Sequence, residues 1–500
     1  MSYQALLTRI HEIYDLRKAA RVLAWDREVV MPKGGDADRV QQITTLNRLA
    51  HSLYTADEIG ALIECAAVEQ NGAGYESAEA SLIRFLRHDY AQARKLPADF
   101  VSQFAALRSQ ATAIWKVARE EDSFATFEPW LAQIASLSRQ MASYLGYETE
   151  PYDALLGRHE PGAQTAAVEE SFSALKAELV PLYFQIRERP DAVGDDFLHQ
   201  RFDIAGQEHF SRYLAAAVGY DFNRGYLATA VHPFSTSLSR NDVRITTRYY
   251  TNFLSASIFA TLHEAGHAVY VQNVHPDLTR TPLAKETSAG LDESQSRLVE
   301  NFIGRSRGFW RAHLPRLQAL FPQQLGEVSL EAFYRAVNKV QPGLVRVEAD
   351  ELTYNLHVIL RFEIERLLIN GEFPIQELPA VWADKSQELL GIRPRSHRLG
   401  CLQDIHWAMV GFGYFPTYAL GNLYAAQLVE AAFQSDVEMA AALDEGEIGP
   451  LMNWLRENVQ VFGRMLTPAE LIQRATGRPL DHSAFVTYLS AKLSEVYDLG

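Results

Sequence analysis

The sequence predicts a mostly helical protein with one small sheet, from two patterns in its apolar residues. Over residues 1 to about 225, and again from 253 to the C-terminus, apolar residues recur every three or four positions, which is the spacing of an amphipathic helix face. Between these regions, apolar and polar residues alternate with the period of two that is typical of a β-strand. Turn signals are short and no Pro/Ser-rich linker is present, so we expect residues 1–500 to form a single unit and place no internal boundary.

The elements follow these patterns in order along the chain. The first region shows successive helices, for example in the spacing of Leu6, Ile10, Ile13 and Leu16. In residues 231–250, Val243, Ile245, Thr247 and Tyr249 alternate with polar residues, and the small residues 235–239 precede them across Arg240-Asn241. This arrangement predicts a β-hairpin. Helical spacing resumes at Phe253 and Leu254 and persists to the C-terminus.

Composition excludes several classes of protein. The chain has 47 Lys and Arg against 62 Asp and Glu, a net charge of −15, which disfavours phosphate backbones and anionic lipid surfaces as partners. No stretch of about eighteen consecutive apolar residues is present to span a membrane. The only cysteines, Cys65 and Cys401, are too few for a disulfide framework. We therefore expect a cytoplasmic protein with no nucleic-acid or membrane partner.

The segment from His263 to His267 has the pattern His-Glu-x-x-His within a helical spacing. Two histidines four residues apart lie on one helix face and can direct both imidazoles at a single zinc ion. Glu264, beside the first histidine, can take a proton from metal-bound water. Gly266 is costly inside a helix, which indicates that another backbone packs closely against it. The segment predicts a catalytic metal site.

A catalytic zinc usually has three protein ligands, and two downstream glutamates compete for the third position. Glu286 follows His267 after residues 268–285, the spacing of one large aminopeptidase family. Glu293 follows after residues 268–292 and begins a helical pattern, whereas residues 287–290 after Glu286 resemble a loop. A helix is the more rigid platform, which favours Glu293 without excluding Glu286.

Polar residues elsewhere are candidates for substrate contacts. Asp242, Arg244 and Thr246 share one face of the predicted strand, and an edge strand beside a peptidase site can pair with an extended substrate. Three more residues occur in two later polar clusters: Arg346, His406 and Tyr418. An arginine can hold a terminal carboxylate, and His or Tyr can stabilise an oxyanion, although spacing alone does not assign these roles.

Six motifs, in order, resemble the carboxypeptidase Taq family of metallocarboxypeptidases. They are His232-Pro233-Phe234, Asp242-x-Arg244-x-Thr246, the His-Glu-x-x-His of 263–267, Glu293-Ser294-Gln295, Arg346-x-x-Ala349-Asp350 and Gly400-x-x-Gln403-Asp404-x-His406-Trp407. Weaker similarity, for example in Trp25-Asp26 and Glu160-Pro161-Gly162, extends over nearly the whole chain.

The resemblance implies a large helical metallopeptidase fold with a deep cleft and the small sheet beside the metal helix. It implies a homodimer that releases single amino acids from peptides with a free C-terminus by metal-activated water. It makes Glu293 the third ligand beside His263 and His267, with Glu264 as the base. It assigns Arg346 to the substrate's terminal carboxylate and makes His406 and Tyr418 candidate oxyanion or substrate contacts, with Asp242, Arg244 and Thr246 shaping the adjoining strand.

The resemblance leaves two points open. The family usually has a histidine immediately before its ligand glutamate, where this chain has Asp292, and an anion there is expected to change the acidity of metal-bound water or the substrate contacts. Zinc is the expected metal, but cobalt and manganese suit the same imidazole and carboxylate ligands; we expect no organic cofactor.

Two alternatives use the same residues. An aminopeptidase or endopeptidase would use Glu286 as its ligand, but the Gly-x-Met-Glu-Asn pattern of that aminopeptidase family is absent upstream. A non-catalytic, metal-containing peptide-binding protein is suggested only by Asp292.

Overall fold

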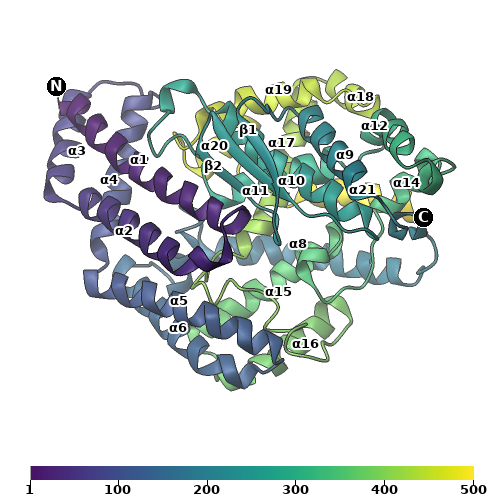
Figure 1. The fold of residues 1–500 in the computed structure, drawn as a ribbon, viewed down its shortest axis with the longest axis horizontal. Helices are drawn as coiled ribbons and strands as arrows, with labels where there is room; N and C mark the ends of the chain where they lie inside the picture. Colours follow the sequence, from purple (N-terminus) through teal and green to yellow (C-terminus); the bar gives the residue numbers. More distant parts are fainter. Residues whose placement is uncertain (1, 500) are drawn as a thin grey trace.

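The structure, a computed structural model, describes residues 2–499 and confirms the mostly helical class with a small sheet (Figure 1). The helices before the sheet are α1 (Ser2–Val29), α2 (Asp36–Tyr54), α3 (Asp57–Glu69), α4 (Ala78–Lys95), α5 (Ala98–Glu120), α6 (Phe124–Leu145), α7 (Pro151–Leu156), α8 (Thr165–Arg187) and α9 (Ile204–Ala217). The helices after it are α10 (Leu254–Asn273), α11 (Ala289–Arg297), α12 (Arg307–Leu320), α13 (Pro322–Leu325), α14 (Leu330–Val337), α15 (Glu351–Asn370), α16 (Leu378–Leu390), α17 (Pro416–Ser435), α18 (Glu438–Asp444), α19 (Gly449–Asn458), α20 (Pro468–Thr476) and α21 (Ser483–Tyr497).

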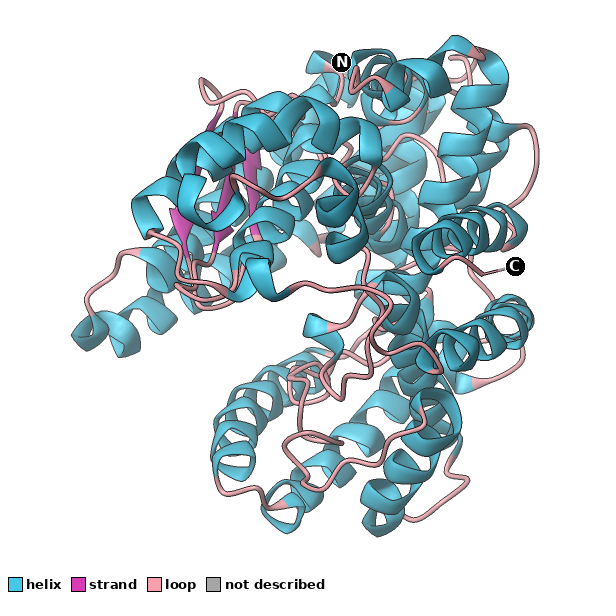
Figure 2. Cartoon of the chain, turned by 90° about the vertical axis from the view of Figure 1, so that its right-hand side faces the viewer, coloured by secondary structure: helices cyan, strands magenta, loops and turns pink. Residues whose placement is uncertain are grey.

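The sheet has three strands in the order β1-β3-β2, gathered at one side of the helical body (Figure 2). Strands β2 (Ser235–Ser239) and β3 (Asp242–Thr247) form the predicted antiparallel hairpin, with an irregularity between Ser237 and Ser239. Strand β3 ends at Thr247, two residues before the alternating pattern does. Strand β1 (Gly225–Thr229) pairs in parallel with β3 and was not predicted, because its five residues show no clean alternation.

Buried hydrophobic side chains form two clusters that meet at helix α10. The larger cluster draws on α5 to α21 and includes Ile258 and Leu262 of α10. The smaller one joins α1 to α4 and receives Tyr270 and Val274, at the other end of the same helix. Helix α10 therefore connects the N-terminal helices to the rest of the molecule.

Two glycines allow helix α11 to lie very close to its neighbours. A Cβ atom on Gly266 of α10 would lie 2.5 Å from the carbonyl oxygen of Gln295. A Cβ atom on Gly421 of α17 would lie 2.7 Å from Cγ of Glu293. Helix α11 is thus held between α10 and α17 at distances that only glycine permits, as Gly266 indicated. This packing sets the position of Glu293.

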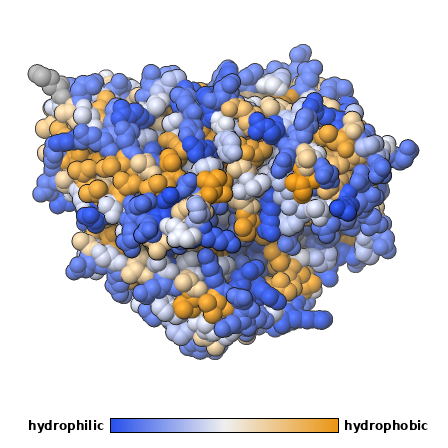
Figure 3. Space-filling model, viewed as in Figure 1, coloured by the Kyte–Doolittle hydropathy of each residue, from blue (hydrophilic) through white to orange (hydrophobic). Residues whose placement is uncertain are grey.

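The face drawn in Figure 3 mixes hydrophilic and hydrophobic residues and is hollowed near its centre, below α1 and the sheet. Within residues 2–499, none of the helices combines the length and the apolar character that a membrane span requires.

Candidate metal centre and active site

Helix α10 carries two histidines whose side chains meet. Nε2 of His263 lies 3.3 Å from Nε2 of His267, one turn further along the helix. The helix is apolar nearly all round and packs against β3, α9 and α11, so both imidazoles extend from a rigid, buried element. Glu264, between them, is also buried, with 6% of its surface exposed.

Each imidazole is oriented by a carboxylate on its other nitrogen. Nδ1 of His263 lies 3.0 Å from Oε2 of Glu300, and Nδ1 of His267 lies 2.8 Å from Oδ1 of Asp292. A carboxylate accepts a hydrogen bond, so Nδ1 donates in both rings and each neutral ring presents a lone pair at Nε2. Two lone pairs 3.3 Å apart repel each other unless a cation lies between them. The two imidazoles are therefore arranged to bind one cation between their Nε2 atoms.

Glu293 of α11 supplies a third donor atom at the same point. Its Oε2 lies 3.9 Å from Nε2 of His263 and 3.6 Å from Nε2 of His267. Its Oε1 accepts a hydrogen bond of 2.8 Å from Nε of Arg297, one turn later, which leaves Oε2 facing the histidines. The three donor atoms lie within 4.8 Å of one another. Two imidazoles and one carboxylate are the donor set of many catalytic zinc sites, so these residues fit a divalent metal ion.

Glu286, the other glutamate considered as a ligand, lies in the irregular segment before α11 and outside this convergent group. Its Oε1 accepts a hydrogen bond of 2.8 Å from Nζ of Lys285. Burial alone raises the pKa of Glu286, but Lys285 and Arg464 outweigh this effect and lower the pKa to about 2. Glu286 is thus a permanent anion that pairs with a lysine at the wall of the same cavity.

The charges of the site influence one another strongly. Burial lowers the pKa of His267, but the carboxylates of Asp292 and Glu293 outweigh it and raise the pKa to about 10. The same carboxylates that favour a proton on His267 would favour a metal ion at its Nε2 atom. Burial raises the pKa of Glu264, and the neighbouring histidines oppose part of the rise. The acidic surroundings favour a cation at the Nε2 atoms.

A cavity of about 300 Å³ opens beside the three donor atoms. Its wall includes Glu264 of α10, Ser235 and Ser237 of β2, Arg21 of α1 and Tyr418 of α17. Strand β2 lies at the edge of the sheet, so its outer side faces this space without a neighbouring strand. The cavity brings a metal-binding group, a buried carboxylate and an edge strand together.

Arg346 and His406 lie behind Tyr418 and do not line this cavity. The Arg346 guanidinium carbon is 4.8 Å from the centre of the Tyr418 ring, and Nε2 of His406 is 3.1 Å from the Tyr418 hydroxyl. Nη2 of Arg346 donates to Oδ1 of Asp404 at 2.9 Å, and Nη2 of Arg361 lies 2.6 Å from Oδ2 of the same carboxylate. Two arginines share one carboxylate, so this cluster places a net positive charge behind Tyr418.

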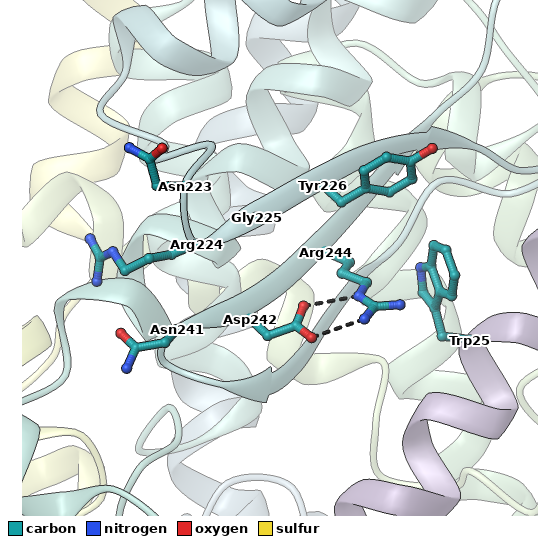
Figure 4. A pocket seen from close by; sticks show the side chains of 8 residues that line it. All are labelled: Trp25, Asn223, Arg224, Gly225, Tyr226, Asn241, Asp242 and Arg244. Atoms are coloured by element: carbon teal, nitrogen blue, oxygen red, sulfur yellow. Dashed lines mark hydrogen bonds and ion pairs between the residues drawn. The ribbon is translucent and has the colours of Figure 1, made fainter.

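Asp242 and Arg244 line a different cavity, on the face of the sheet near the end of α1 (Figure 4). Nε and Nη2 of Arg244 each lie 2.9 Å from an Asp242 oxygen, and the guanidinium carbon is 4.5 Å from the centre of the Trp25 ring. Thr246 is fully buried, and its hydroxyl accepts a hydrogen bond of 2.8 Å from the backbone N–H of Phe234, which lines the metal cavity. Strand β3, which carries these three residues, is the central strand of the sheet, so the expectation of an edge strand at this position was wrong and the edge strand beside the metal cavity is β2.

Three residues of the site were not predicted in their present roles. Glu300 and Arg297 follow Glu293 by seven and four residues, which places them on the same helical face. That spacing is the signal that could have identified both. Arg21 gave no such signal, because it is separated from the His-Glu-x-x-His segment by more than two hundred residues.

Glu160 holds the N-terminal end of α11. One of its carboxylate oxygens accepts hydrogen bonds from the hydroxyls of Ser288 and Tyr424, both at 2.9 Å, and the other accepts from the backbone N–H of Gly290 at 3.0 Å. The residue is 1% exposed, and burial raises the pKa of its carboxyl to about 7. Glu160 thus ties a distant loop to the helix that carries Glu293.

Known proteins resemble this chain over its whole length. The sequence profile of the carboxypeptidase Taq (M32) metallopeptidase family matches residues 5–493. Carboxypeptidase 1 of Bacillus subtilis is 37% identical over 493 residues, which cover 97% of this chain and 98% of the relative. Thermostable carboxypeptidase 1 of Thermus thermophilus is 38% identical over 509 residues, which cover 99% of each chain.

Solved structures agree with these relatives. The crystal structure of an M32 carboxypeptidase from Deinococcus radiodurans superposes with a TM-score of 0.96 at 37% identity and covers 100% of both chains. The structure of metallocarboxypeptidase 1 from Trypanosoma cruzi gives a TM-score of 0.93 at 32% identity and covers 98% of this chain and 99% of the other.

Proposed function

This chain belongs to the carboxypeptidase Taq family of metallopeptidases, and on that premise we propose that His263, His267 and Glu293 hold one divalent metal ion and that Glu264 is the catalytic base. The reaction is the release of single amino acids from peptide C-termini. The observation that carries this proposal is the convergence of two Nε2 atoms and one carboxylate oxygen within 4.8 Å of one another, with a carboxylate behind each imidazole.

A divalent metal ion would be held by His263, His267 and Glu293, and when bound it would supply Lewis-acid chemistry that polarises the scissile carbonyl and lowers the pKa of water. Zinc is the metal we propose, because two imidazoles and a carboxylate are its common catalytic ligands, although cobalt and manganese suit the same set.

Glu264 follows the first proposed ligand directly and lines the same cavity. From this position its carboxylate takes the proton of the attacking water and then carries it to the nitrogen of the leaving amino acid. The Tyr418 hydroxyl, at the cavity wall beside His406, is the proposed hydrogen-bond donor to the developing oxyanion.

The free C-terminus of the substrate is proposed to lie at the Tyr418 side of the cavity. Arg346 and Arg361 share only one carboxylate there, so the field behind Tyr418 is positive and attracts the terminal carboxylate. In the structure Arg346 is bound to Asp404 and to the Tyr354 hydroxyl, so we propose that it acts through this field and through the Tyr418 ring that it supports.

Exopeptidase action on C-termini is tested with an N-terminally blocked peptide and the metal-loaded protein. Mass spectrometry is expected to show stepwise loss of C-terminal residues, and a chelator is expected to abolish it. Internal cuts would indicate an endopeptidase, and cleavage that requires a free N-terminus would indicate an aminopeptidase. A peptide that binds but is never shortened would contradict the proposed chemistry.

Assembly and location are proposed from the family resemblance and from the thiols. We propose a homodimer, which light scattering after size-exclusion chromatography tests directly. Cys65 and Cys401 are both free cysteines, and we propose the cytoplasm, where thiols stay reduced, as the compartment.

A further inference from the structure

Helix α1 brings Arg21 to the wall of the metal cavity. The residue is exposed, and its neighbours at this wall include Ser237 of β2 and Glu286. Within residues 2–499, no hydrogen bond or ion pair involves the Arg21 side chain. A cation therefore faces the cavity with its hydrogen-bond donors available.

The other cations near Arg21 already have partners. Nζ of Lys18, one turn earlier on α1, donates a hydrogen bond of 2.6 Å to the carbonyl oxygen of Ser237. Nζ of Lys285 donates to Glu286 at 2.8 Å, so this anion of the cavity wall already has a cationic partner. Burial first, and then the charges of Arg21 and Lys285, lower the pKa of Lys18 to about 7. Because Glu286 is already paired with Lys285, Arg21 adds a positive charge to this end of the cavity, although the whole chain carries a net charge of −15.

Arg21 lies beside the expected path of the substrate residues that precede the scissile bond. This placement rests on the proposed function. If the free C-terminus lies beside Tyr418, the residues before the scissile bond extend away from it, along the edge strand β2. Lys18 binds the Ser237 carbonyl, so α1 lies over that strand. Arg21 then borders the path of the residues that precede the scissile bond.

We propose that Arg21 is a specificity-determining residue that recognises an acidic side chain at one of the two positions before the scissile bond. A guanidinium forms two parallel hydrogen bonds with a carboxylate, and that pairing discriminates charge and shape together. In an extended peptide successive side chains point to opposite sides, so only one of the two positions is expected to face α1.

Matched blocked peptides test the proposal. They differ only in having Glu, Gln or Lys at the first or the second position before a constant C-terminal residue. For the wild-type protein we expect kcat/KM for Glu to exceed that for Gln by about five-fold at one of these positions, mainly through KM, as for a partly exposed ion pair. Arg21→Gln is expected to remove this preference, and Arg21→Glu to shift it toward Lys.

Arg17→Gln is the matched control, because it removes the same charge from the same helix. The Arg17 guanidinium lies over the Tyr54 ring, at 4.8 Å from the ring centre to its carbon, and not at the cavity. This variant is expected to keep the preference for Glu. A general effect of helix charge would change both variants alike and would overturn the proposal.

Calorimetric titration of the same peptides separates this proposal from the proposed function. Tighter binding of the Glu peptide that is lost in Arg21→Gln supports the role of Arg21 even if no peptide is cleaved, an outcome that would reject only the proposed chemistry. Equal binding and equal cleavage of the Glu and Gln peptides by the wild-type protein would overturn the proposal, as would a preference that survives in Arg21→Gln.

Discussion

Oδ1 of Asp292 lies 2.8 Å from Nδ1 of His267, so the residue immediately before one proposed metal ligand orients another. The two residues are on different helices, α11 and α10, and the hydrogen bond joins them across the site. A carboxylate in this position selects the tautomer with its lone pair at Nε2 and makes the imidazole a stronger donor to a metal. Asp292 thus orients His267, and its effect on the acidity of metal-bound water or on substrate contacts stays a prediction.

Replacing Asp292 with alanine is expected to lower metal affinity by about 10- to 100-fold, because His267 loses the partner that orients it. Competition with a chromophoric chelator measures the affinity. Excess metal is expected to restore much of the activity. Asp277→Ala, at an exposed carboxylate, is the control, and equal affinities of the two variants would contradict the role of Asp292.

Glu264→Gln is expected to lower turnover by about 10²- to 10⁴-fold, because the amide cannot accept the proton of the attacking water. Metal content, measured by mass spectrometry, is expected to stay at the wild-type value, since Glu264 is not among the three convergent donors. Full activity in this variant would exclude Glu264 as the base.

Gly266→Ala is expected to destabilise the protein by about 1–3 kcal/mol, the usual range for overpacking. The new Cβ atom would lie 2.5 Å from the backbone oxygen of Gln295 and 2.7 Å from Cα of Ser296, so α10 and α11 must separate. Urea unfolding measures the loss. Gly449→Ala is the control, because nothing lies within 4 Å of its Cβ. Equal stabilities would show that the two helices separate at no cost.

Glu160→Gln is expected to change how stability depends on pH. The folded-state pKa is raised from 4.5 to about 7, so the native state favours the protonated carboxyl, and ionisation opposes folding as the pH rises from 4.5 to 7. The destabilisation of the folded state by ionisation of Glu160 reaches about 3 kcal/mol above pH 7 and is absent below pH 4.5. The Gln variant lacks this destabilisation. Its amide oxygen can accept the hydrogen bond from the Gly290 N–H, and its NH2 group can donate to the hydroxyls of Ser288 and Tyr424.

Urea unfolding at pH 5 and pH 8 checks this expectation. The free energy of unfolding of Glu160→Gln, relative to wild type, is expected to increase from pH 5 to pH 8. Glu178→Gln, at an exposed carboxylate of α8, is the control and is expected to show no such trend. A constant difference for Glu160→Gln would show that the carboxyl is ionised throughout this range in the folded protein.

Local patterns predicted those parts of the fold that depend on neighbouring residues. The helices and the β2–β3 hairpin follow from the spacing of apolar residues and from the short Arg240-Asn241 connection. Strand β1 was missed because its five residues become a strand only through pairing with β3. Asp242 and Arg244 line a cavity other than the metal cavity. A contact between these two residues and the substrate stays a prediction.

The sequence by itself determined that His263, Glu264 and His267 lie within about one turn of a helix, because a separation of four residues corresponds to a fixed distance in a helix. It also indicated, through Gly266, that another backbone lies against that helix. The sequence already favoured Glu293 over Glu286 as the third ligand, and the tertiary structure brings the Glu293 carboxylate and the two imidazoles together. Only the tertiary structure showed that Asp292 and Glu300 orient the imidazoles and that Arg21 reaches the same cavity. These relationships join segments far apart in the chain, and their distances are set by how α1, α10, α11 and α17 pack, which no local spacing encodes.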